Sequence, residues 1–413
     1  MAIWKKTFGC LLGIAMSLLL SLAASGQVEV SWKQEVADLV QKAIAAKKIP
    51  GAVVLVAQQG KILLHEAYGQ RALIPQPEKM SLDTIFDMAS LTKSMVTAIC
   101  IMKLVEDGKL KVTDKVSWYL PQFGQNGKED ITIEQLLLHT AGLIPDNAQD
   151  DYEHGIEKAY ARIDALKLKA PPGTRFIYTD VGYIVLGRVV EKITGQPLDV
   201  IAQRWIIEPL QMQDTGYRRI SNQTLPPTTL IAPTEKEGDI ILRGIVHDPR
   251  ARQLDGVAGH AGLFSTSSDV LKFAQMLLQL GSYEGKTILK PETVKLMALA
   301  RQVPGGGMRA YGWDVDTGYS SPRGDRFPVG LSFGHTGYTG TSLWIDPTSQ
   351  SCVIILTNRA HPDDKGDVTP LRRAIGSLVA RRLPVQPARS PVRQRAGTDD
   401  DKQKKPREGP RGS

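Results

Sequence analysis

A serine and a lysine three residues apart are the pair in this sequence best suited to chemistry. Ser90 and Lys93 lie in MASLTKSM (residues 88–95), which opens a segment that is apolar on nearly every face as far as Leu104. A helix that is hydrophobic all round is normally buried, and a buried ammonium is costly without partners. Residues i and i+3 of a helix are about 5–6 Å apart at Cβ, so Lys93 reaches the Ser90 hydroxyl and can activate it. The alternative is a lysine that packs its stem and extends its head to the surface.

Two further motifs follow along the chain. Tyr178-Thr179-Asp180 comes after the turn Pro-Pro-Gly-Thr at residues 171–174, and His335-Thr336-Gly337 stands just before two strand-like segments near the C-terminus. Each has an ordinary alternative when taken alone, because Tyr178 can be a half-buried aromatic and His335 a loop histidine. Asp180 fits the N-cap of the helix that follows as well as it fits a substrate contact. Three ordered motifs are far more specific than one.

Together the three motifs resemble the signature of serine β-lactamases and penicillin-binding proteins, in which Ser-x-x-Lys is followed by S-D-N or its equivalents and by K-T-G. The resemblance is closest to the branch of class C β-lactamases, DD-peptidases and related esterases. It covers about residues 33–384 and includes LLLHTAGL (136–143) and AGHAGLFSTSSDVLKF (258–273).

The resemblance implies a mechanism. Ser90 attacks a carbonyl and becomes acylated, while Lys93 and Tyr178 share the proton transfers, with the choice of base left open. The backbone N–H groups of Ser90 and Tyr338 hold the oxyanion. The expected substrate-binding residues are Asp180, His260, His335, Thr336 and Gly337, although a core or loop role suits His260 about as well.

Two positions depart from the family pattern. Asp180 replaces an amide side chain that binds the acylamido carbonyl of penicillins and peptides, and an ionised carboxylate donates no hydrogen bond. Recognition of β-lactams is therefore in doubt. His335 replaces the lysine of K-T-G and carries only a conditional charge near neutral pH.

Composition and the chain ends predict an exported globular enzyme. The 413 residues are 42% hydrophobic and 23% charged, which suffices for a large core. Residues 1–26 combine Lys5 and Lys6 with an apolar run and a small-residue cleavage site, as in a signal peptide. We therefore expect a periplasmic or extracellular protein. No later apolar run approaches the ~20 residues of a membrane span, and residues 385–413 predict a disordered basic tail.

Charge and metal-binding side chains exclude other classes of function. The net charge of +8 falls to about +2 for residues 27–384, so the folded body gives no sign of nucleic acid binding. Cys100 and Cys352 each lie in an apolar run and are expected to be inert buried thiols. The seven histidines form no close ligand pair and no H-E-x-x-H motif. We expect no cofactor, and a small-molecule or peptide substrate such as a cell-wall peptide.

The pattern of elements predicts an α/β (α+β) fold like that of β-lactamases. A hairpin turning at Gln59-Gly60 near the N-terminus and strands near the C-terminus would form one antiparallel sheet. Helices flank that sheet, and a mostly helical insertion at about residues 110–255 lies within the 27–384 domain. Helices are predicted at 32–46, from Ser90 to Gly108, and within 131–143, 181–195, 267–281 and 370–382, and C-terminal strands within 341–347 and 351–359.

Two rival interpretations remain at this point. Gly330-Leu331-Ser332-Phe333-Gly334 matches the G-x-S-x-G of α/β-hydrolases, but that motif needs a helix directly after the serine, and a strand-like sequence follows here. The fold could also be a catalytically silent binding module. The substrate stays open between a D-amino-acid peptide, a small ester and a β-lactam, because the loops at about 144–170 and 221–255 have no readable code.

Overall fold

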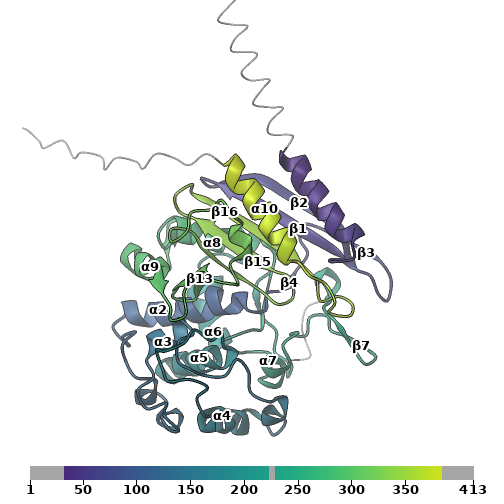
Figure 1. Cartoon of the computed structure of the whole chain (residues 1–413). Helices are drawn as coiled ribbons and strands as arrows, with labels where there is room; N and C mark the ends of the chain where they lie inside the picture. The colour runs from purple at the N-terminus through teal and green to yellow at the C-terminus, as the bar shows by residue number, and fades with distance from the viewer. Residues whose placement is uncertain (1–31, 223–227, 384–413) are drawn as a thin grey trace, which may run out of the picture.

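The structure, a computed structural model, describes residues 32–222 and 228–383. The predicted signal peptide, the predicted basic tail and both predicted domain ends, residues 27 and 384, lie outside the described residues. Figure 1 shows a central sheet between two layers of helices. Its nine strands run in the order β11-β12-β13-β14-β15-β16-β1-β2-β3. The C-terminal strand β16 therefore pairs with the N-terminal strand β1, antiparallel, which confirms a sheet built from both ends of the chain.

The elements fall into three groups. The main sheet contains β1 (Gly51–Gln58), β2 (Lys61–Ala72), β3 (Glu78–Lys79), β11 (Arg301–Gln302), β12 (Met308–Ala310), β13 (Trp313–Asp316), β14 (Phe333–Thr336), β15 (Ser342–Asp346) and β16 (Ser351–Thr357). A small sheet joins β4 (Phe86–Asp87), β8 (Leu263–Ser265) and β5 (Gly216–Tyr217). The main helices are residues 32–45, α2 (Ala98–Glu106), α3 (Ile133–Leu137), α4 (Ile156–Ala165), α5 (Asp180–Thr194), α6 (Leu198–Ala202), α7 (Pro249–Gln253), α8 (Ser267–Leu278), α9 (Pro291–Ala298) and α10 (Thr369–Arg382).

Burial on both faces explains why the central strands are continuously apolar. Along β1, Val53 and Leu55 face one hydrophobic core, whereas Val54 and Val56 face the other. Helix 32–45 and α10 cover the second core, and α8 packs on β1, β15 and β16 from the opposite side. Strands covered on both sides lose the alternation of polar and apolar residues.

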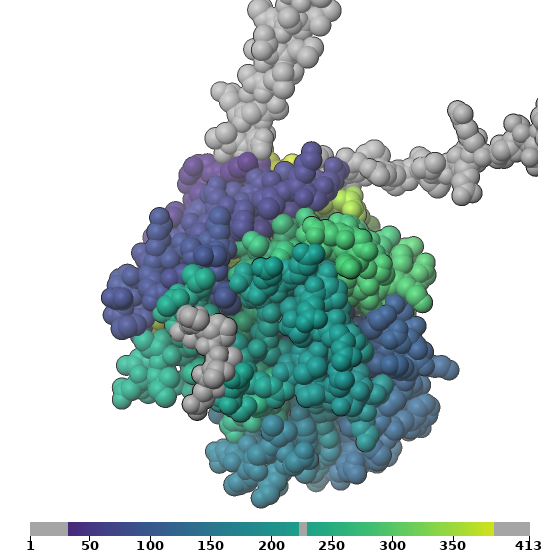
Figure 2. Space-filling model, turned by 180° about the vertical axis from the view of Figure 1, so that it is seen from behind, coloured from purple at the N-terminus to yellow at the C-terminus, as the bar shows by residue number. Residues whose placement is uncertain are grey.

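The predicted helical insertion is present beside the sheet. Helices α3, α4, α5, α6 and α7 all fall between residues 110 and 255, and they form the half of the molecule away from the terminal helices (Figures 1 and 2). Among residues 32–222 and 228–383, no helix is both long and apolar enough to cross a membrane.

The G-x-S-x-G interpretation is wrong. Ser332 is buried immediately before β14 and donates from Oγ to the Pro328 carbonyl oxygen at 2.8 Å. A strand rather than a helix follows it, so the exposed strand-turn-helix geometry of a hydrolase nucleophile is absent here.

The two cysteines of the described residues are free and buried. Cys100 lies on α2 and Cys352 on β16. Burial raises the pKa of the Cys352 thiol to about 12 and that of Cys100 still further above its usual value. Both thiols are therefore protonated and unreactive at neutral pH.

We predict that native protein expressed from residue 27 does not react with Ellman's reagent. After denaturation in guanidinium chloride, it should release two equivalents of the coloured thiolate. The reason is that the reagent reacts with an accessible thiolate, whereas both native thiols are buried and protonated. A Cys352→Ser variant provides the control, since it should release one equivalent after denaturation. Rapid reaction of a thiol in the native protein would contradict the buried placement.

Candidate active site

Ser90 lies in a tight turn at the start of a helix that runs over residues 91–106. The preceding residue, Ala89, has a φ of 46°, which is uncommon for a residue other than glycine, and its N–H donates to Asp87 Oδ1 at 2.8 Å. The Lys93 N–H then bonds back to the Ser90 carbonyl oxygen at 3.1 Å. Because the Ser90 N–H comes before the first helical turn, it has no acceptor inside the helix and can bind an anion.

Lys93 is fully buried and contacts oxygen atoms from three segments of the chain. Its Nζ donates to Ser90 Oγ at 2.9 Å and to the His260 carbonyl oxygen at 3.1 Å, and it lies 2.6 Å from Asp180 Oδ1. The first two contacts are hydrogen bonds, and the third is an ion pair. Burial alone lowers the pKa of Lys93, but Asp180 and the Tyr178 phenol outweigh burial and raise it above its usual value. The lysine is therefore cationic at neutral pH.

An extended residue brings Tyr178 and Asp180 to the same side of the chain. Thr179 between them has φ −141° and ψ 129°, and side chains two residues apart share a side in an extended segment. The Thr179 hydroxyl faces the other way, donating to the Ile144 carbonyl oxygen at 2.6 Å and accepting the Gly182 N–H at 3.3 Å. Thr179 is thus the N-cap of α5, and the interpretation of Asp180 as that N-cap is wrong.

The Tyr178 ring is held between aromatic and cationic side chains. It stacks on His139 at 4.4 Å between ring centroids, and its centroid lies 5.2 Å from Lys93 Nζ. His139 also accepts the Thr179 N–H at Nδ1, at 3.1 Å. Reasoning from the sequence did not single out His139, although LLLHTAGL contains it. Its contacts show that it positions the 178–180 segment.

His335 is neutral in the folded protein. Burial, followed by the charges of Arg309 and Lys93, holds its pKa well below the usual 6.5. Arg309 is itself fully buried, with its Cζ 5.9 Å from the Tyr178 ring centroid. The conditional charge expected at this position is therefore absent at neutral pH, and the nearby cations are Lys93 and Arg309.

The turn after β14 packs directly on the nucleophile turn. A Cβ at Gly337 would lie 2.5 Å from the Met88 carbonyl oxygen, which leaves room only for glycine. Thr341 Oγ1 donates to that same Met88 oxygen at 3.1 Å, and Thr339 Oγ1 donates to the Asp87 oxygen at 2.7 Å. The two predicted oxyanion donors, on Ser90 and Tyr338, are thus carried by turns that are bonded to each other.

A groove of about 280 Å³ brings most of the predicted site residues together. It is lined by Ser90, Tyr178, Asp314, Tyr319, His335, Thr336, Gly337, Tyr338, Arg359, Gly366, Asp367, Val368, Thr369 and Arg372. Lys93 and Asp180 contact this set without lining the groove. The arrangement can bind a carbonyl next to Ser90 and keep a lysine ammonium beside the nucleophile.

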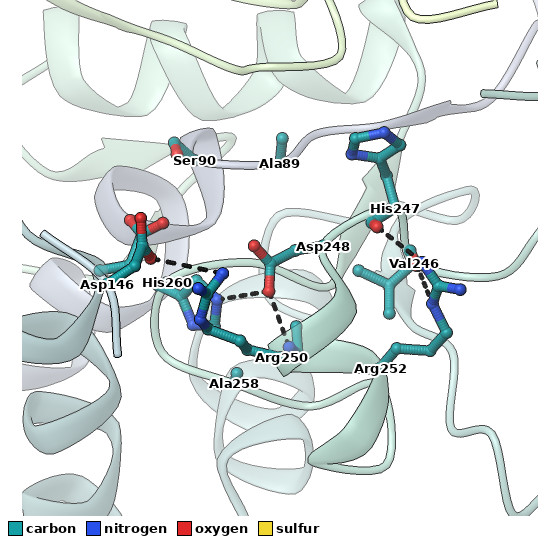
Figure 3. A network of polar contacts seen from close by, with 12 residues as sticks. Ala89, Ser90, Asp146, Val246, His247, Asp248, Arg250, Arg252, Ala258 and His260 are labelled. Carbon is teal, nitrogen blue, oxygen red and sulfur yellow. Dashed lines mark hydrogen bonds and ion pairs between the residues drawn. The ribbon is translucent and has the colours of Figure 1, made fainter. Parts of the chain in front are cut away.

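His260 lies behind Lys93 rather than in the groove. Its ring is fully buried, and Nε2 is 2.9 Å from Asp248 Oδ1. Figure 3 shows this pair beneath the Ser90 turn, beside Asp146 and Arg250, which are 3.7 Å apart. The carbonyl of His260, not its ring, contacts Lys93. A substrate contact by His260 stays a prediction that this geometry does not favour.

Two groups of side chains among the described residues could bring carboxylate and imidazole ligands to a metal ion. They are Asp180, Asp248 and His260, and Glu235, His247 and Asp364. In the first group the Lys93 ammonium already neutralises Asp180. In the second, Asp364 accepts from the Tyr338 hydroxyl at 2.6 Å and pairs with Arg359 at 3.0 Å. Both groups are thus engaged by side chains of the protein itself.

Comparison with known proteins identifies the family. The family model described as Beta-lactamase matches residues 36–377, most of the chain. The chain belongs to the β-lactamase family. With homologues named as amidase, carboxypeptidase and β-lactamase, it is a serine hydrolase, and the interpretation as a silent binding module is set aside.

Several individual relatives are similar along most of their length. An N-acetylmuramyl-L-alanine amidase of Bacillus subtilis (strain 168) is 32% identical over 377 residues, covering 82% of this chain and 83% of the relative. A putative D-alanyl-D-alanine carboxypeptidase of Salmonella schwarzengrund (strain CVM19633) is 32% identical over 347 residues, covering 76% of this chain and 79% of the relative. Among solved structures, EstCE1, a hydrolase with promiscuous acyltransferase activity, has a TM-score of 0.67 at 25% identity. The match covers 86% of this chain and 99% of EstCE1.

A further structure, β-lactamase/D-alanine carboxypeptidase from Pseudomonas syringae, matches in fold. Its TM-score is 0.69 at 18% identity, and the match covers 86% of this chain and 99% of the other. The β-lactamase-like fold predicted from the sequence is confirmed.

We predict that acidification destabilises the protein through its buried neutral histidines. His139 and His335 both have a pKa held well below 6.5, so the unfolded state binds more protons as the pH falls through 6.5. The free energy of unfolding therefore decreases as the pH is lowered through this range. Asp87, whose pKa burial raises to about 6, acts in the opposite direction between about pH 4 and 6.

Thermal unfolding at pH 7.5, 6.5 and 5.5 checks this expectation. The Tm of the wild type should fall toward pH 5.5, and the Tm of a His335→Gln variant should fall by less, because the variant lacks one of the histidines whose pKa is lowered by burial. The contribution of Asp87 is common to both proteins and cancels in the comparison. Identical pH dependence of the two Tm values would show that His335 is not held neutral.

Proposed function

We propose that this protein is an exported hydrolase that cleaves a cell-wall-type amide through an acyl-enzyme on Ser90. The observation that carries the proposal is the bonding of Ser90 Oγ to a buried, cationic Lys93 in a groove that Tyr178 and Tyr338 also line. Ser90 Oγ would attack the carbonyl carbon, and the N–H groups of Ser90 and Tyr338 would stabilise the oxyanion. Water would then release the acyl group and regenerate the serine.

Tyr178 is the better candidate for the general base. Lys93 already carries its third proton, since Asp180 lies 2.6 Å from Nζ, so it cannot also accept the proton of Ser90. A cationic lysine 5.2 Å from the phenol ring would instead stabilise Tyr178 as the phenolate that a base requires. In this scheme Tyr178 reacts as the phenolate, having already lost its own proton to solvent. It takes the proton of Ser90 and returns it to the leaving amine, while Lys93 stays protonated throughout.

The charges around Ser90 support a substrate other than a typical penicillin. Asp180 neutralises Lys93, and His335 is uncharged where K-T-G would supply a lysine. The groove therefore lacks two features with which the family recognises β-lactams, an amide donor and a lysine cation. The relatives named as a muramyl-L-alanine amidase and a putative D-alanyl-D-alanine carboxypeptidase support a peptide amide of the cell wall.

A small ester is the second candidate substrate. The similarity to EstCE1, described as a hydrolase with promiscuous acyltransferase activity, favours it. Export to the periplasm or the exterior is supported by the signal-like residues 1–26, and a cell-wall substrate is reached there. His335, Thr336 and Gly337 would contact the leaving group or carboxylate of either substrate.

We predict that Ser90→Ala abolishes both covalent labelling and turnover. Intact-mass spectrometry should show a fluorophosphonate adduct on the wild type and none on Ser90→Ala. Any adduct that benzylpenicillin or p-nitrophenyl acetate leaves on the wild type should be absent from Ser90→Ala as well. Hydrolysis of the ester and release of D-alanine or L-alanine from muramyl peptides should be followed in parallel. Loss of the nucleophile should reduce kcat by at least about 10³-fold.

Ser332→Ala is the matched control, because Ser332 is a buried serine in the competing motif. It should keep labelling and turnover at the wild-type level. Unchanged labelling of Ser90→Ala, or loss of labelling in Ser332→Ala alone, would overturn the proposal. Release of D-alanine, release of L-alanine, or ester turnover alone would distinguish the carboxypeptidase, amidase and esterase versions.

We predict that Asp180→Asn speeds acylation by benzylpenicillin up to about tenfold, because the new amide can donate one hydrogen bond to the acylamido carbonyl. The rate of adduct formation by intact mass measures this. The same variant should lower the Tm, since Lys93 loses its counter-ion while still buried. Asp146→Asn removes a nearby acid without a contact to Lys93 and should change neither. A slower or unchanged acylation in Asp180→Asn would show that Asp180 does not restrict β-lactam recognition.

A further inference from the structure

Arg372 is a buried arginine whose partners are backbone carbonyls of the active-site turn. It projects from α10, in the same layer as the helix at residues 32–45, and only 6% of it is exposed. Its Nη2 donates to the Gly337 oxygen at 2.9 Å and to the Thr341 oxygen at 2.7 Å. Within the part of the chain that the structure describes, its Nε has no hydrogen-bond partner. Burying a guanidinium in this way is unfavourable, which calls for a function.

We propose that Arg372 is the positioning residue of the oxyanion hole, holding the Gly337–Tyr338 peptide in the orientation that presents the Tyr338 N–H to the substrate. This inference rests on the proposed acyl-enzyme function, in which that N–H is one of two donors. Arg372 acts through the backbone and not by contact with the reacting atoms.

The Gly337–Tyr338 peptide plane connects Arg372 to the Tyr338 N–H. The Gly337–Tyr338 bond is trans, since the cis bonds of the described residues lie elsewhere, and in a planar trans peptide the C=O and N–H point in opposite directions. A guanidinium that fixes the Gly337 oxygen therefore also fixes the direction of the Tyr338 N–H. The next carbonyl, of Tyr338, is held by Arg359 Nε at 2.6 Å. The donor thus lies between two carbonyls, each bonded to an arginine.

The turn is also fixed from its other side. Gly337 packs on the Met88 carbonyl without space for a side chain, and its N–H bonds to the Thr341 oxygen at 2.7 Å. Because Arg372 Nη2 bonds both the Gly337 and the Thr341 oxygens, one nitrogen closes the turn over residues 337–341. Without it, the peptide could rotate and turn its N–H away from the groove. A donor placed in advance costs no reorganisation during the reaction.

A different role is conceivable, because Arg372 also lines the groove and could bind an anionic group of the substrate directly. The two roles differ in one measurable respect. A direct contact would matter only for substrates with an anionic group and would act mainly on KM. A positioned oxyanion donor matters for every substrate and acts on kcat, because its hydrogen bond strengthens in the transition state.

The test compares Arg372→Met and Arg372→Lys with Arg373→Met, which removes the exposed neighbouring arginine of the same helix. Steady-state kinetics use p-nitrophenyl acetate, which is uncharged, and p-nitrophenyl hemisuccinate, which carries a carboxylate. Inhibition by phenylboronic acid, a neutral transition-state mimic, is measured alongside the Tm of each variant. Labelling of Ser90 by a fluorophosphonate in the wild type checks the underlying function.

We expect Arg372→Met to lower kcat for both esters by about 10²-fold, near the effect of removing one oxyanion donor, with KM almost unchanged. The Ki of phenylboronic acid should rise in parallel. Arg372→Lys should recover part of the loss and Arg373→Met should match the wild type. The lysine variant keeps the test decisive even where Arg372→Met folds poorly.

Three results would overturn the inference. A higher KM for the hemisuccinate alone would assign Arg372 to anion binding. A lower Tm with unchanged kcat in the folded Arg372→Lys protein would leave only a structural role. Wild-type protein that is neither labelled at Ser90 nor active on an ester would overturn the proposed function itself, which is distinguishable because it precedes any comparison of variants.

Discussion

The buried ammonium of Lys93 is the constraint on which the arrangement of the active site depends. A cation with no access to water has to be matched by acceptors at close range, and here these come from Ser90, Asp180 and the carbonyl of His260. These three partners belong to the nucleophile turn, the start of α5 and the segment before β8. Satisfying one lysine therefore holds together three parts of the chain that are distant in sequence.

This requirement also fixes the distribution of charge. Asp180 pairs with Lys93, and burial, followed by the charges of Arg309 and Lys93, keeps the pKa of His335 low and its ring neutral. The surroundings of Tyr178 are thus Lys93 paired with Asp180, the buried Arg309, and the neutral ring of His139, which stacks on the phenol. With these histidines neutral, the oxygen atoms of Ser90 and Tyr178 are the groups positioned to exchange a proton beside the groove.

Local patterns in the sequence predicted a large part of this structure. The hairpin turning at Gln59-Gly60, the helix after Ser90 and the helix ended by Gly195 follow from periodicity and turn residues, and all three are present. The contact between Ser90 and Lys93 follows from helical spacing alone. Sheet formation from both chain ends followed from the order of strands and helices. Apart from the sheet, each of these features is encoded within a few neighbouring residues.

The features that could not be predicted depend on contacts between distant residues. Asp180 illustrates this, because a carboxylate before an apolar helix is equally typical of an N-cap, a substrate contact and a counter-ion. Only the position of Lys93 in space decides among them. The N-cap is the preceding residue, Thr179. His139 and Arg372 are similar, since a histidine in a turn and an arginine on a terminal helix have no local signal for the backbone groups that they bind. Sequence motifs thus point to the groups that are proposed to react, whereas the groups that orient them become visible only through the fold.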